Sequence, residues 1–401
     1  MPQDSRTRVA ASMSMHIWKS WRGTFAAGVV AGATATHLAA CDTAEREAGA
    51  ETPTSDAASA IVPAPAYREP YGPPGAGSAL DAAIAVREAL TEEQASVLTL
   101  PIDSPLRGNW SNLPASMVSF DHNGVRLGDL TPEQLARVFD FLAAALGPHG
   151  YETVTQVVAA EAVLGQSLWA RVGGLTEENY WLAFFGEPSA TGAWGWQFGG
   201  HHLGVNGSFA GGKATSLSPT FLGAEPARFT LAGLEAAPLA DELEAGRAVM
   251  RVLPAELKAE ATIGPSQMQA GAGRDGEIPE LRGSAVANWP SEARSLLLQT
   301  ILHWVALQPP EHAAPRMAEL EETVHELHFA WSGATLQDDE DTYFHIQGPT
   351  LIIEFAIQDI GEGGHFHSVY RDPTNEYGRG TRGLSGHHPP VDSALPEAAS
   401  P

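Results

Sequence analysis

The sequence predicts an α+β fold in which helices come first and antiparallel β-sheet segments, interleaved with further helices, follow. Apolar residues recur at helical spacing over residues 80–98 and 130–170. Residues 180–230 and 325–370 are instead aromatic, rich in glycine and short in period, as in twisted strands and hairpins. The hydrophobic fraction of 43% over 401 residues is enough to bury a core. Because neither β-rich segment is long enough for a separate sheet, we expect a single large domain over residues 80–390.

The first forty residues have the features of a secretory signal. Four basic residues precede an apolar run that starts at Phe25 and is shorter than the roughly 18 residues that a membrane-spanning helix needs. The run ends in small residues followed by Cys41, the only cysteine, as in bacterial lipoproteins, where this thiol takes the lipid. We predict a lipoprotein signal peptide over residues 1–40 and lipidation of Cys41, with an ordinary signal peptide as the alternative. The expected location is the cell envelope, on the periplasmic side of a bacterial membrane.

Two segments are expected to lack fixed structure. Residues 41–79 are rich in Ala, Pro, Glu, Ser and Thr, a composition with too little apolar surface to offset the entropy of ordering. We predict that they form a disordered tether between the lipidated cysteine and the domain. Residues 391–401 are predicted to be a frayed tail.

Charge and cysteine content exclude several classes of protein. The chain has 48 acidic and 23 basic side chains and a formal charge of −25, so it offers no basic stripe to a phosphate backbone. We therefore expect no nucleic-acid partner. A single cysteine excludes a disulfide framework and metal sites built from several thiolates.

Two helix starts share one capping pattern. Residues 90–94 (Leu-Thr-Glu-Glu-Gln) and 130–134 (Leu-Thr-Pro-Glu-Gln) place a threonine three residues before a glutamine, so that each side chain satisfies a free amide of the first turn. We attribute this recurrence to capping and not to an internal repeat. An apolar stripe from Leu135 to Leu146 follows the second start, and Gly147-Pro148 is expected to end that helix. Further helices are expected at about residues 154–170, 237–257 and 291–308.

Strands are expected in two blocks, separated by the helix at 237–257, a loop at about 260–288 and the helix at 291–308. The first block contains residues 181–186 and the segment Trp194–Asn206. The second runs from about residue 325 to 370, with strands that begin at Leu327, Tyr343, Leu351 and His365.

Histidines in both blocks suggest a metal site. His365 and His367 are two residues apart, and residues i and i+2 of a strand share a face, so both imidazoles can point at one ion. In the doublet His201-His202, strand alternation groups His201 with the apolar Leu203 and leaves His202 on the polar face with Asn206. We therefore favour His202 as the third ligand.

Two carboxylates accompany these histidines. Glu354 lies in Leu-Ile-Ile-Glu-Phe-Ala-Ile, where an ionised group is costly unless it is paired or metal-bound, so it is a candidate fourth ligand. Glu225 and His201 are candidate catalytic groups beside the ion. Imidazoles and carboxylates without thiolates suit zinc, iron, manganese or copper. Alternatively, the histidines are structural and Glu354 pairs with Arg371 or Arg379.

Seven segments in one order carry a family resemblance. They are residues 90–94, 107–110 (Arg-Gly-Asn-Trp), 130–134, 194–206, 218–226, 346–354 and 365–372. In this order the chain resembles DUF3500, a bacterial and fungal domain family of unknown function, over about residues 85–380. The family has no settled activity, so the resemblance implies the extent of the domain and no chemistry.

Three functions remain open. The first is a metal-dependent enzyme, either a hydrolase or an iron or copper oxidoreductase, acting on a small or polymeric extracellular substrate. Trp194 and Trp196 would wall its substrate pocket, Asn206 would contact the substrate, and Arg371 would anchor an anionic one. The second is a non-catalytic lipoprotein that binds a ligand such as a glycan through tryptophan faces. The third is a structural role in the envelope.

Overall fold

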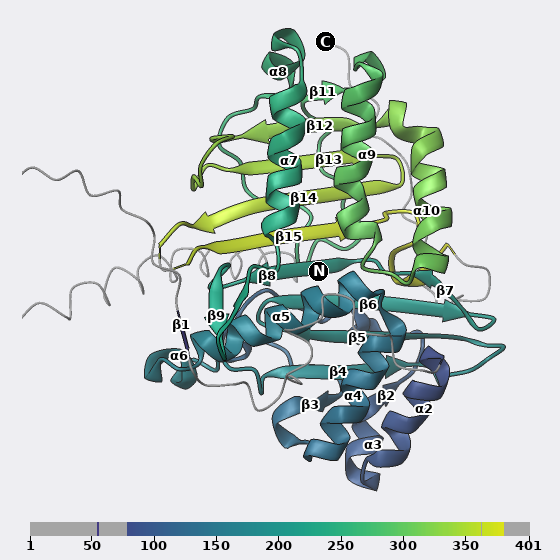
Figure 1. Ribbon diagram of the computed structural model, residues 1–401. Coiled ribbons are helices and arrows are strands. Elements are labelled where there is room, and N and C mark those ends of the chain that lie inside the picture. The colour runs from purple at the N-terminus through teal and green to yellow at the C-terminus, as the bar shows by residue number, and fades with distance from the viewer. Residues whose placement is uncertain (1–53, 56–77, 362, 381–401) are drawn as a thin grey trace, which may run out of the picture. The chain divides into compact units, whose positions relative to one another are not determined.

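The computed structural model describes residues 54–55, 78–361 and 363–380 (Figure 1). The predicted signal peptide, Cys41, the tail at 391–401 and most of the predicted tether lie outside these residues. Within the predicted tether, Thr54–Ser55 form the short strand β1, which pairs in parallel with β9 (Phe229–Leu231). β9 also pairs with β10 (Leu234–Ala236) to complete a small sheet. In the described ranges, no helix combines the length and hydrophobicity needed to span a membrane.

A twelve-stranded mixed sheet forms the centre of the structure. Its strands are β2 (Thr99–Leu100), β3 (Val125–Arg126), β4 (Tyr180–Phe185), β5 (Ala193–Gly200), β6 (Leu203–Ala210), β7 (Lys213–Ser216), β8 (Thr220–Ala224), β11 (Ser284–Ala285), β12 (His328–Ser332), β13 (Tyr343–Gly348), β14 (Leu351–Asp359) and β15 (His365–Arg371). The spatial order is β11-β12-β13-β14-β15-β8-β6-β5-β4-β2, while β3 pairs with β4 and β7 with β6. Neighbours are antiparallel except β2 and β4, which are parallel. This sheet and its helices confirm the predicted α+β class.

Most helices begin near the predicted residues, but the helix predicted at about 154–170 begins at Pro148 and ends at Leu164. The helices are α2 (Ala79–Ala89), α3 (Glu92–Leu98), α4 (Pro132–Ala145), α5 (Pro148–Leu164), α6 (Leu168–Val172), α7 (Ala240–Val252), α8 (Ala255–Ala261), α9 (Ser291–Val305) and α10 (Pro310–Thr323). Thr91 and Thr131 form the predicted capping boxes of α3 and α4. Pro148 does not only end the preceding helix: it also takes the first position of α5, where proline fits without losing a hydrogen bond. The helix predicted at 237–257 is split into α7 and α8 at Leu253 and Pro254, and Pro254 takes the N-cap position of α8 without a side-chain cap.

The two halves of the sheet repeat one arrangement, which the sequence analysis does not anticipate. In the first half, the helix pairs α2/α3 and α4/α5 flank the short strand β3 and are followed by β4, β5, β6 and β8. In the second, α7/α8 and α9/α10 flank β11 and are followed by β12, β13, β14 and β15. β3 pairs with β4 as β11 pairs with β12. The halves join where β8 and β15 pair in the middle of the sheet (Figure 1).

Helices cover one face of the sheet and loops cover the other. On the helix-covered face, Phe141 of α4 packs edge-on against Trp196 of β5, and Trp304 of α9 donates a hydrogen bond to Ser368 of β15. On the loop-covered face, Trp110 packs 6.2 Å from Phe221 of β8, and the amide of Gln269 reaches Glu354 of β14. The loop-covered face carries buried polar groups such as His365, His367 and Glu354 beside apolar residues such as Phe221 and Val369.

Candidate metal centre

Three buried histidines converge at one end of the β8–β15 pair. The Nε2 atom of His202 lies 3.0 Å from Nε2 of His365, which lies 2.8 Å from Nε2 of His367. One ligand atom from each of the three residues lies within 4.8 Å of the other two. Their exposed fractions are 0%, 4% and 7%. These are the three histidines that the sequence analysis selects as ligands.

Strand geometry brings the three rings together. His365 and His367 lie on one face of β15, as the spacing predicts, and His202 lies where β6 begins on the other side of β8. Gly223 of β8 sits between them, opposite His367 in the ladder. A Cβ atom at Gly223 would lie 2.7 Å from Cδ2 of His202 and 2.9 Å from Cδ2 of His367. The absence of a side chain at Gly223 is therefore what lets both rings pack over this strand.

His201 and His202 form the two-residue turn of the β5–β6 hairpin, not part of a strand. The alternation of side chains along a strand correctly predicts that Leu203 faces the core. It does not apply to the two turn residues. Both imidazoles therefore point the same way, with ring centroids 3.7 Å apart. The doublet contributes two neighbouring groups where alternation predicts one.

Glu161 of α5 holds the doublet, and the sequence analysis missed it. Nδ1 of His201 lies 3.0 Å from Oε1 of Glu161, and Nδ1 of His202 lies 3.2 Å from Oε2. Burial alone would raise the pKa of Glu161, but the two imidazoles outweigh this effect and lower the pKa to about 2. The sequence signal was a single carboxylate in the apolar stretch of α5, the same type of signal that drew attention to Glu354.

A second carboxylate lies behind His365. Oε2 of Glu225, which follows β8 and precedes the cis-proline Pro226, is 3.4 Å from Nδ1 of His365. His202 and His365 thus each turn Nδ1 to a carboxylate and Nε2 to the other histidines. A carboxylate that accepts the Nδ1 proton leaves a lone pair on Nε2, which is how metal-binding histidines are commonly oriented.

The electrostatics favour a cation between the rings. Burial and the neighbouring His201 lower the pKa of His202 to about 4, even though Glu161 opposes the shift. Burial, together with the neighbouring His202 and His201, lowers the pKa of His367 well below its ordinary value. If both Nδ1 atoms carry their protons toward the carboxylates, the Nε2 lone pairs of His202 and His365 face each other across 3.0 Å, and a shared cation would accept both. Zn–N bonds of about 2.0–2.1 Å in a tetrahedron separate the nitrogens by about 3.4 Å, so small ring movements would admit an ion.

Glu354 does not join this group. Its carboxylate accepts hydrogen bonds from the Tyr343 hydroxyl at 2.6 Å and from the amides of Gln269 at 2.9 Å and Ala270 at 2.7 Å. In the ladder it faces Val369, one pair of residues beyond His367 on that face. The hydrogen-bond partners that make this buried carboxylate tolerable are a tyrosine and two loop amides, and the charge of Arg282 adds to them.

The other residues predicted to bind substrate also have structural partners. Trp194 and Trp196 lie in the core of the helix-covered face, where both pack against Phe141. Asn206 donates to the carbonyl of Pro219 and accepts a hydrogen bond from Gln197. Arg371, buried at the end of β15, pairs with Glu376, as expected of a salt-bridged strand end. The structure brings none of these four to the three histidines, because strand alternation directs the tryptophans inward and local partners hold the polar groups.

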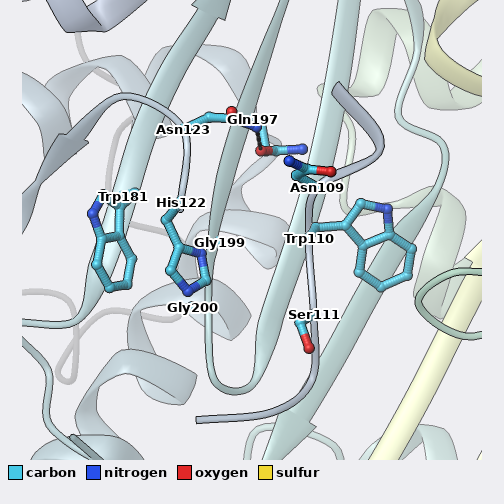
Figure 2. Close-up of a pocket in the computed structure, with 9 residues that line it drawn as sticks. All are labelled: Asn109, Trp110, Ser111, His122, Asn123, Trp181, Gln197, Gly199 and Gly200. Carbon is cyan, nitrogen blue, oxygen red and sulfur yellow. Dashed lines mark hydrogen bonds between the residues drawn. The ribbon is translucent and has the colours of Figure 1, made fainter. Parts of the chain in front are cut away.

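A small hollow on the loop-covered face adjoins the histidine turn (Figure 2). It is shallow, partly open to solvent, with room for about one water molecule, and it reaches Gly200 beside His201. The rings of His122 and Trp181 stack at 4.0 Å on one side, and Trp110 lies on the other. Asn123 donates to Gln197 at 2.9 Å at its upper end. The hollow therefore offers aromatic and amide groups next to the histidine turn, from residues that the sequence analysis did not select for a site.

The family comparison agrees with the resemblance noted in the sequence. The family model described as a protein of unknown function (DUF3500) matches residues 75–379. No curated protein and no solved structure matches the chain.

Proposed function

The chain belongs to the DUF3500 family, and we propose that it is a metal-dependent enzyme of the bacterial cell envelope. His202, His365 and His367 would hold one transition-metal ion: zinc, iron or copper. The observation that carries the proposal is the convergence of three buried Nε2 atoms, two of them on rings whose Nδ1 atoms face Glu161 and Glu225.

The donor set supports catalysis more than a purely structural site. Three protein ligands leave a coordination position for water or substrate, whereas structural zinc sites have four protein ligands. In such a site zinc supplies an acidified water with a pKa of about 7 for hydrolysis, and iron or copper supplies redox chemistry. Glu161 and Glu225 orient the ligand rings and increase their basicity. The groups around the neighbouring hollow would contact part of a small or polymeric extracellular substrate bound over it.

The proposed location rests on the amino-terminal sequence. Basic residues, a short apolar run and Cys41 support export and lipidation. Acyl chains on Cys41 would then hold the domain at a membrane of the envelope.

Metal content tests the proposal. We expect the purified wild-type protein to lose one equivalent of metal when His365 and His367 are both changed to alanine, with an unchanged circular dichroism spectrum. His312→Ala/His325→Ala, which removes two histidines outside this centre, is the matched control and should keep the full content. Zinc would favour hydrolysis, and iron or copper would favour oxidation. Equal metal content in the wild type and the folded His365→Ala/His367→Ala variant, after dialysis against each metal, would contradict the proposal.

A second candidate function is metal-independent glycan binding. The stacked rings of His122 and Trp181 and the amides around them are the kinds of groups that commonly hold sugars. Glycan binding that survives EDTA and His365→Ala/His367→Ala, but is lost in Trp181→Ala, would favour this function over catalysis.

A further inference from the structure

A second histidine and carboxylate group lies among the helices, outside the metal centre. His149 is in the first turn of α5, Glu242 in the first turn of α7, and His303 in the last turn of α9. One ligand atom from each residue lies within 4.8 Å of the other two. His149 and Glu161 are twelve residues apart on α5, which places this group about 18 Å along the helix from the carboxylate that holds the histidine turn.

Glu242 is the unusual member of this group. Its side chain is 1% exposed, and among the described residues neither carboxylate oxygen receives a hydrogen bond. Nε2 of His149 lies 3.6 Å from Oε1 of Glu242, beyond hydrogen-bond distance. A buried carboxylate with only this ion-pair contact is costly, because desolvation of the charge is not compensated. A bound cation would supply the missing partner.

The surroundings also favour a cation. The carboxylates of Glu242, Glu152 and Asp241 all act on His149 through their charge. These three negative groups would attract a cation to the site. His149 and His303 are only partly buried, with ring centroids 6.1 Å apart, so an ion can enter from solvent between them.

We propose that His149, Glu242 and His303 form a second site for a divalent transition-metal ion of the zinc class. Two imidazoles and one carboxylate are a donor set that zinc and iron(II) accept, with positions left for water. α5 belongs to the first half of the repeat and α7 and α9 to the second. An ion at this site therefore links the two halves through their helices, and it does so independently of the three-histidine centre.

Zinc titration of metal-stripped His365→Ala/His367→Ala protein isolates this site from the first one. We expect that protein to bind one equivalent of zinc by calorimetry. Adding Glu242→Gln, which keeps the side-chain volume, should weaken binding at least about 100-fold, and adding His303→Ala should do the same. Adding His325→Ala, an exposed histidine elsewhere, should leave binding unchanged.

Thermal unfolding gives an independent readout in the otherwise unaltered chain. Zinc in excess should raise the midpoint of the wild type more than that of Glu242→Gln, because an ion that binds only the folded state stabilises it by mass action. A folded His365→Ala/His367→Ala protein that binds no zinc would overturn the second site alone. Zinc affinity and thermal response that are unchanged by Glu242→Gln and His303→Ala would overturn it too.

Discussion

The hairpins β5–β6 and β13–β14 hold corresponding places in the two halves, but their turns differ in chemistry. His201-His202 connect the first hairpin, and Pro349-Thr350 connect the second. Asn206 and Glu354 hold equivalent positions on the second strands of these hairpins, six residues after the last residue of β5 and of β13. Both are buried on the loop-covered face. Asn206 is satisfied by Gln197 and a carbonyl, and Glu354 by a hydroxyl and two amides. One scaffold thus accepts different polar groups wherever the neighbouring turn or loop supplies their partners.

The largest effect is expected from breaking the turn that carries the histidines. His201→Ala/His202→Ala removes both partners of Glu161 and leaves a buried charge, which costs about 3–5 kcal/mol of unfolding free energy. It should also abolish metal binding at the three-histidine centre. Urea unfolding and metal analysis measure the two effects. Pro349→Ala/Thr350→Ala, at the corresponding turn, should change stability by less than about 1 kcal/mol. Similar losses at the two turns would show that the histidines have no special role.

Glu354→Leu tests whether the second hairpin contributes to the metal centre. The substitution leaves the Tyr343 hydroxyl and the amides of Gln269 and Ala270 without their acceptor, so we expect a loss of about 3 kcal/mol in chemical denaturation. Metal content should stay at the wild-type level in the folded variant. Loss of an equivalent of metal would instead restore Glu354 as a ligand.

The pH dependence of stability sharpens the same contrast. Burial raises the pKa of Glu354 above its ordinary value of 4.5, although Tyr343 and the two amides partly oppose this shift. A raised folded-state pKa contributes stability that is present below pH 4.5 and is lost as pH rises through the folded-state pKa. The stability of the wild type relative to Glu354→Gln should therefore decrease as pH rises from 4.5. Denaturation curves from about pH 4 to 8 measure it, and a difference that grows with pH would contradict the assignment.

The smallest effect is expected at the helix starts. Thr131 caps α4 through a capping box, whereas its counterpart α9 begins after Pro290 with no side-chain cap. Thr131→Ala should cost about 1 kcal/mol, because it leaves a first-turn amide without its acceptor. Pro290→Ala should cost about half of that or less, because it removes no cap. Equal losses in thermal or urea unfolding would mean that capping does not distinguish the halves.

Local patterns could be predicted from the sequence, and long-range partners could not. The capping boxes at Thr91 and Thr131, the shared face of His365 and His367 and the α+β class depend on neighbouring residues. The family resemblance is confirmed as well. Glu161 was missed, and Glu354 was assigned an ion as its partner. A lone carboxylate in an apolar segment gives the same sequence pattern whether its partner is a histidine in a turn or an amide in a loop.

The repeat was hidden for a related reason. Corresponding helices start with different residues: Leu-Thr-Pro-Glu-Gln before α4, and Trp-Pro-Ser-Glu-Ala before α9. Both satisfy the same backbone geometry, since a capping threonine and a proline are alternative ways to begin a helix. The arrangement is therefore visible in the order and pairing of the elements, while the residues that produce it have little in common.

The pairing of β8 with β15 also determines when, during folding, the three histidines can come together. His202 and His365 are 163 residues apart, so closing the loop between them is among the entropically costly steps of folding. A growing chain that has reached β14 holds only one of the three ligands. Capture of the proposed ion would then wait until the last strand has docked. Because such an ion would bind only the closed form, it would slow the separation of β8 from β15.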